Sequence, residues 1–167
     1  MVVAKLIHKL SDRLDSVCGV LCVFFLTSMV LITGLQVVCR MYFTALAWSE
    51  ELTRYFLVWS TFLGAACVYK RMGHINVTII RGLFPPKVQK TLQVLVHLLC
   101  TVFFIIAIYY GIKYMNIQSR QLSAAMRIPM RWVYLAIPLG CGIMLLHVLD
   151  LLARALPGAT TTEELRS

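Results

Sequence analysis

The chain has 167 residues, of which 60% are hydrophobic and 14% are charged, and its mean hydropathy is +0.81. This composition excludes a water-soluble domain and indicates an integral membrane protein. The net charge of +9 does not indicate a nucleic-acid partner, because in a membrane protein the positions of the basic residues relative to the bilayer decide their role.

Four apolar runs predict four membrane-spanning helices. A bilayer core about 30 Å thick is crossed by roughly 20 apolar residues in a helix, and such runs occur at about 17–39, 52–69, 88–110 and 132–152. Before them, residues 2–16 place apolar side chains at helical spacing, which predicts an amphipathic lead-in at the membrane surface. Strands with open edges are excluded in lipid. We therefore predict an all-α protein with one membrane domain over 1–155 and a polar cytoplasmic tail over 156–167.

The basic residues predict the orientation of the four spans. Ten Lys and Arg residues fall on the side of the two termini, and six fall on the other side. Because positive charge is enriched in cytoplasmic loops, we expect both termini in the cytoplasm. The connection after the second span, with Gly73, Gly82 and Pro85-Pro86, is then cytoplasmic. The outward connection between the third and fourth spans is basic against this trend, through Lys113, Arg120, Arg127 and Arg131.

Six cysteines raise the possibility of an enzyme that passes electrons from periplasmic disulfides to quinone. That chemistry requires cysteine pairs in outward loops, where a thiolate is solvated. All six fall inside the predicted spans or at their ends, namely Cys18, Cys22, Cys39, Cys67, Cys100 and Cys141. We interpret them as small apolar packing residues and expect no enzyme activity.

Two histidines leave a haem-bearing membrane anchor of a respiratory dehydrogenase as the main alternative. His97 and His147 lie at comparable depths in the third and fourth spans, and two facing imidazoles can ligate a b-type haem. Without haem, His97 is expected to bond a hydroxyl such as that of Thr101, and His147 to join Asp150 and Arg154 on one helix face.

A free-standing transporter needs ionisable groups or broken helices near the bilayer centre. The four spans carry no acid or base at that depth, and we expect neither a cofactor nor a metal site. Small residues four apart do allow helix backbones to approach closely. They are Ser60 with Gly64, and Ala136 with Gly140. These features favour a scaffold.

The start of the second span carries a charged group. Ser49 is the expected N-cap, Glu50 and Glu51 occupy the first turn, and Arg54 follows at ion-pair spacing. With Arg40 and Trp48, this group is expected to anchor the helix end at the interface or to contact a larger subunit.

Several stretches together carry a resemblance to a known family. They are Trp48-Ser49-Glu50-Glu51 with Arg54, Trp59 with Phe62-Leu63-Gly64-Ala65-Ala66, Arg71-Met72-Gly73-His74-Ile75-Asn76-Val77, residues 123–129, and Tyr134 with Ile137-Pro138-Leu139-Gly140. In this order and spacing they resemble the small membrane subunit (DctQ type) of tripartite ATP-independent periplasmic (TRAP) transporters.

The resemblance implies a bacterial inner-membrane protein that assembles with a large multi-span subunit and a periplasmic substrate-binding protein. In that family the large subunit carries the sodium-coupled substrate site, and the small subunit extends the scaffold and helps to dock the binding protein. The basic outward residues named above then meet either an acidic patch on the binding protein or phospholipid headgroups. The family's substrates are mostly organic acids, and no residue of this chain selects among them.

Overall fold

The computed structural model describes residues 2–42, 44, 46–72 and 86–155. The glycines and prolines expected between the second and third spans fall largely outside these residues, and so does the predicted tail at 156–167. The four long helices are α1 (Val2–Tyr42), α2 (Ala47–Met72), α4 (Pro86–Ile117) and α6 (Ala136–Ala155). The 3-10 helix η1 (Gln118–Arg120) and the single turn α5 (Arg131–Tyr134) connect α4 to α6. Apart from one bridge between Leu122 and Pro129, the regular structure of the described part is helical, which confirms the all-α prediction there.

Three of the described segments are long and apolar enough to cross a membrane: Lys9–Tyr42, Val94–Arg120 and Arg131–Leu152. They correspond to the first, third and fourth predicted spans. The second predicted span lies in α2, whose hydropathy is lowered by Arg54 and by polar aromatic residues. The structure thus supports three spans and has the expected four long helices, while the span at 52–69 stays a prediction.

The predicted lead-in and the first span form one uninterrupted helix. No proline occurs between Val2 and Tyr42, so nothing in the backbone forces a break where the amphipathic pattern ends. At 1.5 Å per residue, the 41 residues of α1 extend over about 60 Å, roughly twice the thickness of a bilayer core.

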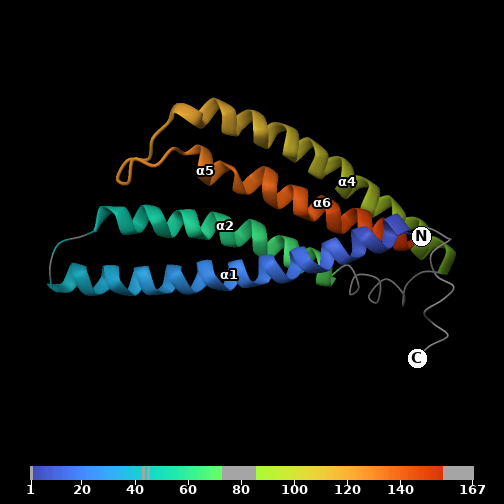
Figure 1. Ribbon diagram of the computed structural model, residues 1–167, viewed down its shortest axis with the longest axis horizontal. Helices are drawn as coiled ribbons and strands as arrows, with labels where there is room; N and C mark the ends of the chain where they lie inside the picture. Colours follow the sequence, from blue (N-terminus) through green and yellow to red (C-terminus); the bar gives the residue numbers. More distant parts are fainter. Residues whose placement is uncertain (1, 43, 45, 73–85, 156–167) are drawn as a thin grey trace.

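The four long helices lie in a layer in the order α1, α2, α6, α4 (Figure 1). The pairs α1–α2 and α4–α6 are antiparallel, whereas the neighbouring helices α2 and α6 run parallel to each other. The helix α6 packs against α1, α2 and α4, whereas α1 and α4 do not pack against each other. The loop between α4 and α6 lies at one end of the layer, together with the end of α1 and the start of α2, and the start of α1 lies at the other end (Figure 1).

Glycines lie at contacts between three pairs of helices, and two of these contacts are tighter than ordinary van der Waals contact. An added Cβ would lie 3.4 Å from Cys22 Sγ at Gly64, 3.1 Å from Ile137 Cγ2 at Gly111, and 2.7 Å from Phe62 Cβ at Gly140. These contacts join α2 to α1, α4 to α6, and α6 to α2 respectively. The tightest of them is at Gly140, where a side chain would overlap Phe62.

The two edge helices leave most of their apolar surface uncovered. In the most apolar stretch of each candidate span, 6% of the residues are buried in α1 and 11% in α4, against 50% in α6. Exposed apolar flanks of this size need lipid or another protein against them.

Candidate functional site

The connection between α4 and α6 folds into a tight loop at residues 121–130. Ser123 N–H donates to the carbonyl of Ile128 at 2.9 Å, and Met130 N–H donates to the carbonyl of Gln121 at 2.9 Å. Ile128 N–H also donates to Ser123 Oγ at 3.2 Å. Arg127 at the turn has a φ of 53°, a left-handed conformation that is uncommon for a residue with a side chain.

Glu51, at the start of α2, binds this loop through its carboxylate. Its Oε1 accepts a hydrogen bond from Ala124 N–H at 3.1 Å, and its Oε2 accepts from Ala125 N–H at 3.0 Å and from Met126 N–H at 2.8 Å. One turn along α2, Tyr55 donates its hydroxyl to Oε1 at 2.6 Å. Three successive amides that converge on one point form an anion-binding concavity, which here holds a carboxylate of the chain itself.

The charged form of Glu51 is strongly favoured. The hydrogen bonds from the Tyr55 hydroxyl and from the loop lower the pKa of Glu51 from its ordinary value of 4.5 to about 2, because these donors stabilise the ionised carboxylate. A lowered pKa in the folded state means that this interaction stabilises the protein fully above pH 4.5 and is lost as the pH falls toward 2. The carboxylate therefore holds the loop throughout the physiological range.

The structure corrects the expected ion pairs at this helix end. The helix α2 begins at Ala47, so Ser49 is not the N-cap but lies in the first turn, where its hydroxyl donates to the carbonyl of Leu46 at 2.7 Å. Glu50 accepts a hydrogen bond from Gln36 Nε2 of α1 at 3.1 Å. Neither glutamate is ion-paired with Arg54 in the part of the chain that the structure describes. The preorganised loop amides offer Glu51 several bonds, whereas an exposed ion pair contributes little.

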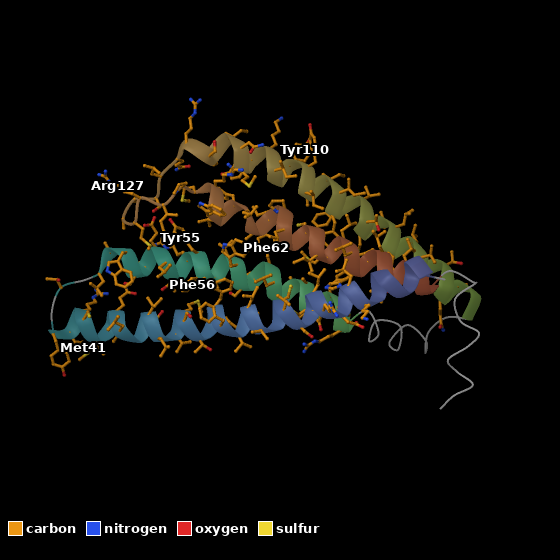
Figure 2. The ribbon with its side chains drawn as sticks, viewed as in Figure 1. Met41, Tyr55, Phe56, Phe62, Tyr110 and Arg127 are labelled. Carbon is orange, nitrogen blue, oxygen red and sulfur yellow. The ribbon has the colours of Figure 1, made fainter. Side chains whose placement is uncertain are left out.

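The other residues predicted at this end are exposed. Arg40, Trp48, Glu50 and Arg54 have exposed side chains, and so have Lys113, Arg120, Arg127 and Arg131. Arg120 ends η1, Arg127 lies in the loop, and Arg131 begins α5. Figure 2 shows Arg127 at the end of the layer, beyond Tyr55 of α2. The structure thus gathers three of the four predicted docking residues around the loop that Glu51 binds.

The small residues predicted to pack helices face the chain's own helices. Ser60 is 5% exposed and Ala136 is 1% exposed. Gly64 lies against Cys22 of α1, and Gly140 lies against Phe62 of α2. The two glycines therefore contact neighbouring helices of this chain.

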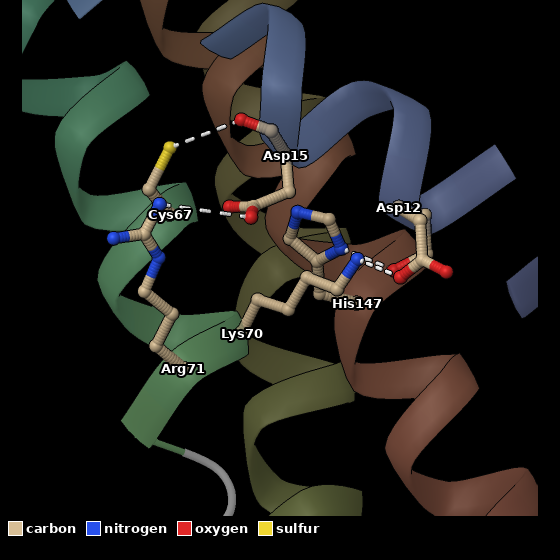
Figure 3. Close-up of polar contacts among 7 residues, drawn as sticks. Asp12, Asp15, Cys67, Lys70, Arg71 and His147 are labelled. Carbon is tan, nitrogen blue, oxygen red and sulfur yellow. Dashed lines mark hydrogen bonds and ion pairs between the residues drawn. The ribbon is translucent and has the colours of Figure 1, made fainter. Parts of the chain in front are cut away.

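A second polar cluster ties α1 to α2 at the opposite end of the layer (Figure 3). Asp12 forms an ion pair with Lys70, and Asp15 forms a second one with Arg71, whose Nη2 lies 3.8 Å from Asp15 Oδ2. The Cys67 thiol donates to the backbone carbonyl of Asp15 at 3.6 Å. Two acidic residues of the predicted lead-in are therefore bound to α2.

His147 lies in the same region and is fully buried, at 0% exposure. Its Nδ1 is 2.8 Å from Ser11 Oγ and forms a hydrogen bond with it, so the ring bonds α1. The side chain of Arg154, expected on the same helix face, lies outside the described residues. The Thr101 hydroxyl donates to the backbone carbonyl of His97 at 2.8 Å and not to its ring. No group of three or more potential metal ligands occurs within the described ranges.

We expect Ser11→Ala to lower the free energy of unfolding by about 1–3 kcal/mol, because it removes the hydrogen-bond partner of a buried imidazole nitrogen. Thermal unfolding of the purified protein in detergent measures this effect. Ser16→Ala is the matched control, since Ser16 lies in the same helix with an exposed side chain. Equal stability of the two variants would contradict the assigned role of the Ser11–His147 bond.

The six cysteines are free. Cys18, Cys67 and Cys141 are buried in the core between the helices, at 2%, 8% and 4% exposure. Buried thiols among apolar side chains are structural and unreactive.

Comparisons with known proteins agree with the resemblance. The family described as "Tripartite ATP-independent periplasmic transporters, DctQ component" matches residues 29–158. The sialic acid TRAP transporter permease protein SiaT of Haemophilus influenzae is 28% identical over 116 residues, which make up 69% of this chain and 19% of SiaT. A putative TRAP transporter small permease protein of H. influenzae is 29% identical over 89 residues, 53% of this chain and 55% of that protein. The C4-dicarboxylate TRAP transporter small permease protein DctQ of Vibrio cholerae is 32% identical over 98 residues, 58% of this chain and 42% of its own length. The matched region thus spans about a fifth of SiaT and about half of the two small permease proteins.

Proposed function

Because this chain belongs to the DctQ-component family of tripartite ATP-independent periplasmic transporters, we propose that it is the small membrane subunit of such a transporter. It braces a large multi-span transport subunit and helps to dock a periplasmic substrate-binding protein. The complex takes up an organic acid with sodium. Membership of a transport family favours this role over the haem-bearing anchor with ligands His97 and His147 and over a disulfide-to-quinone enzyme.

The scaffold role rests on the uncovered flanks of the helix layer. The edge helices α1 and α4 expose long apolar surfaces, while α6 fills the centre. A layer of this kind has two sides free to lie against a larger membrane protein and phospholipid. The large subunit is the proposed partner because SiaT, a relative named as a permease protein, contains the matched region as a fifth of its length.

The docking role rests on charge and on topology. The loop at 121–130 lies at the end of the layer opposite the start of α1 (Figure 1). With the termini in the cytoplasm of a bacterial inner membrane, this loop and its arginines face the periplasm. Two relatives are named for sialic acid and for C4-dicarboxylate, and on that basis we assign an organic acid as the transported substrate.

Reconstitution of the system into liposomes tests the proposal. We expect this chain to co-purify with the large subunit encoded beside it, and uptake driven by a sodium gradient to require both membrane subunits and the binding protein. Liposomes that contain this chain alone are the control and should move no solute. Uptake by the chain alone, or a haem absorption band in the purified protein, would contradict the proposed function.

A further inference from the structure

We propose that Glu51 is the positioning residue of the basic loop, and that it holds Arg120, Arg127 and Arg131 as a preformed docking face for an acidic patch of the binding protein. This inference rests on the docking role proposed above. Glu51 does not itself touch the binding protein in this proposal. It determines the shape of the loop whose arginines contact that protein.

The carboxylate of Glu51 contacts the loop backbone at several points. Three consecutive loop amides, from Ala124 to Met126, donate to the two oxygens of Glu51 at 2.8–3.1 Å. Both carboxylate oxygens are used, so the loop is fixed in orientation as well as in distance. Tyr55 holds the same carboxylate from α2 and also lies 3.5 Å from Met130 Sδ, at the far end of the loop.

The loop depends on support from outside itself. Ala124, Ala125 and Arg127 are exposed, and exposed loops with few buried contacts open at low free-energy cost. Arg127 is also held in the left-handed conformation, which persists where surrounding contacts determine it. The bonds to Glu51 supply such contacts next to Arg127 in the chain.

The contact also affects the charge around the loop. The carboxylate of Glu51 accepts hydrogen bonds from backbone amides, and the carboxylate of Glu50 accepts one from Gln36. Among the described residues, neither carboxylate is therefore paired with an arginine of the loop. In the region the structure describes, no ion pair neutralises Arg120, Arg127 or Arg131, and all three are exposed. The loop therefore presents unpaired positive charges on a fixed backbone. A partner with carboxylates at matching positions would bind without the entropic cost of ordering the loop.

The experiment uses the complex of this chain with its large subunit in nanodiscs and the binding protein of the same system. The variant is Glu51→Gln, with Glu50→Gln as the control that removes the same charge one residue away. We expect Glu51→Gln to speed hydrogen exchange of the 121–130 amides by about tenfold or more and to slow association of the binding protein by about fivefold. Glu50→Gln should leave loop exchange at the wild-type rate.

A second variant separates the loop contact from folding of the chain. Glu51→Ala empties the concavity, and added formate should restore slow exchange by occupying it. Unchanged loop exchange in Glu51→Gln would overturn the assigned contact. Faster exchange with unchanged association would overturn the link to docking. If Arg120→Glu with Arg127→Glu weakens association while Glu51→Gln does not, this inference alone fails; if neither weakens it, the docking role fails as well.

Discussion

Gly140→Ala is expected to destabilise the protein, whereas Gly142→Ala is not. A Cβ at Gly140 would lie 2.7 Å from Phe62 Cβ and 3.1–3.2 Å from two atoms of the Phe62 ring, while nothing lies within 4 Å of a Cβ at Gly142. Relief of the overlap requires α2 and α6 to move apart, which costs about 1–3 kcal/mol in a packed interior. Over most of this range the loss exceeds the roughly 1 kcal/mol that alanine gains over glycine in a helix.

The two glycines form a matched pair because they lie two residues apart in α6 and undergo the same substitution. Thermal unfolding in detergent, together with the yield of monodisperse protein, compares them directly. Gly140→Leu should lower the unfolding midpoint and the yield of monodisperse protein further than Gly140→Ala does. Equal unfolding midpoints for Gly140→Ala and Gly142→Ala would mean that α2 and α6 do not pack at the observed distance.

Arg120→Glu combined with Arg127→Glu is expected to reduce uptake about tenfold at low concentrations of binding protein, with recovery at high concentrations. Reversed charges at a docking face slow association by removing electrostatic steering, and they leave later steps of transport unaffected. The defect should shrink at high ionic strength, where the wild-type advantage is screened. Uptake into proteoliposomes at several binding-protein concentrations measures the effect.

Arg13→Glu is the control for this charge reversal. Arg13 is exposed on α1, near the end of the layer opposite the loop, and its reversal should leave the dependence on binding protein unchanged. Full uptake by the double variant at low salt and low binding-protein concentration would contradict docking. It would indicate that phospholipid headgroups neutralise the two arginines.

The sequence determined the elements because lipid imposes a simple requirement on them. Each span must be a helix of sufficient length with few charges, and that pattern is visible without any tertiary information. It predicted α1, α4 and α6 as membrane-spanning helices, and the combined motifs indicated the family. It also predicted a span at 52–69 in α2, and this helix is not among the three candidate spans of the described residues, since Arg54 and the aromatic side chains lower its hydropathy.

The partners of the polar groups depend on how the helices pack and could not be predicted from the sequence. Glu51 and Ala124 are 73 residues apart, and Ser11 and His147 are 136 residues apart. Glu51 and the loop around Ala124 both lie in stretches that the sequence analysis singled out, but no sequence pattern indicated that the two stretches are in contact. The reason is that Glu51 binds backbone amides, which every residue except proline carries, so no side-chain type marks the residues it binds. Ion pairs between Arg54 and the two glutamates could be expected from their spacing along one helix. The hydrogen bonds that Glu51 makes instead depend on the packing of α2 against α6, which brings the 121–130 loop to the start of α2.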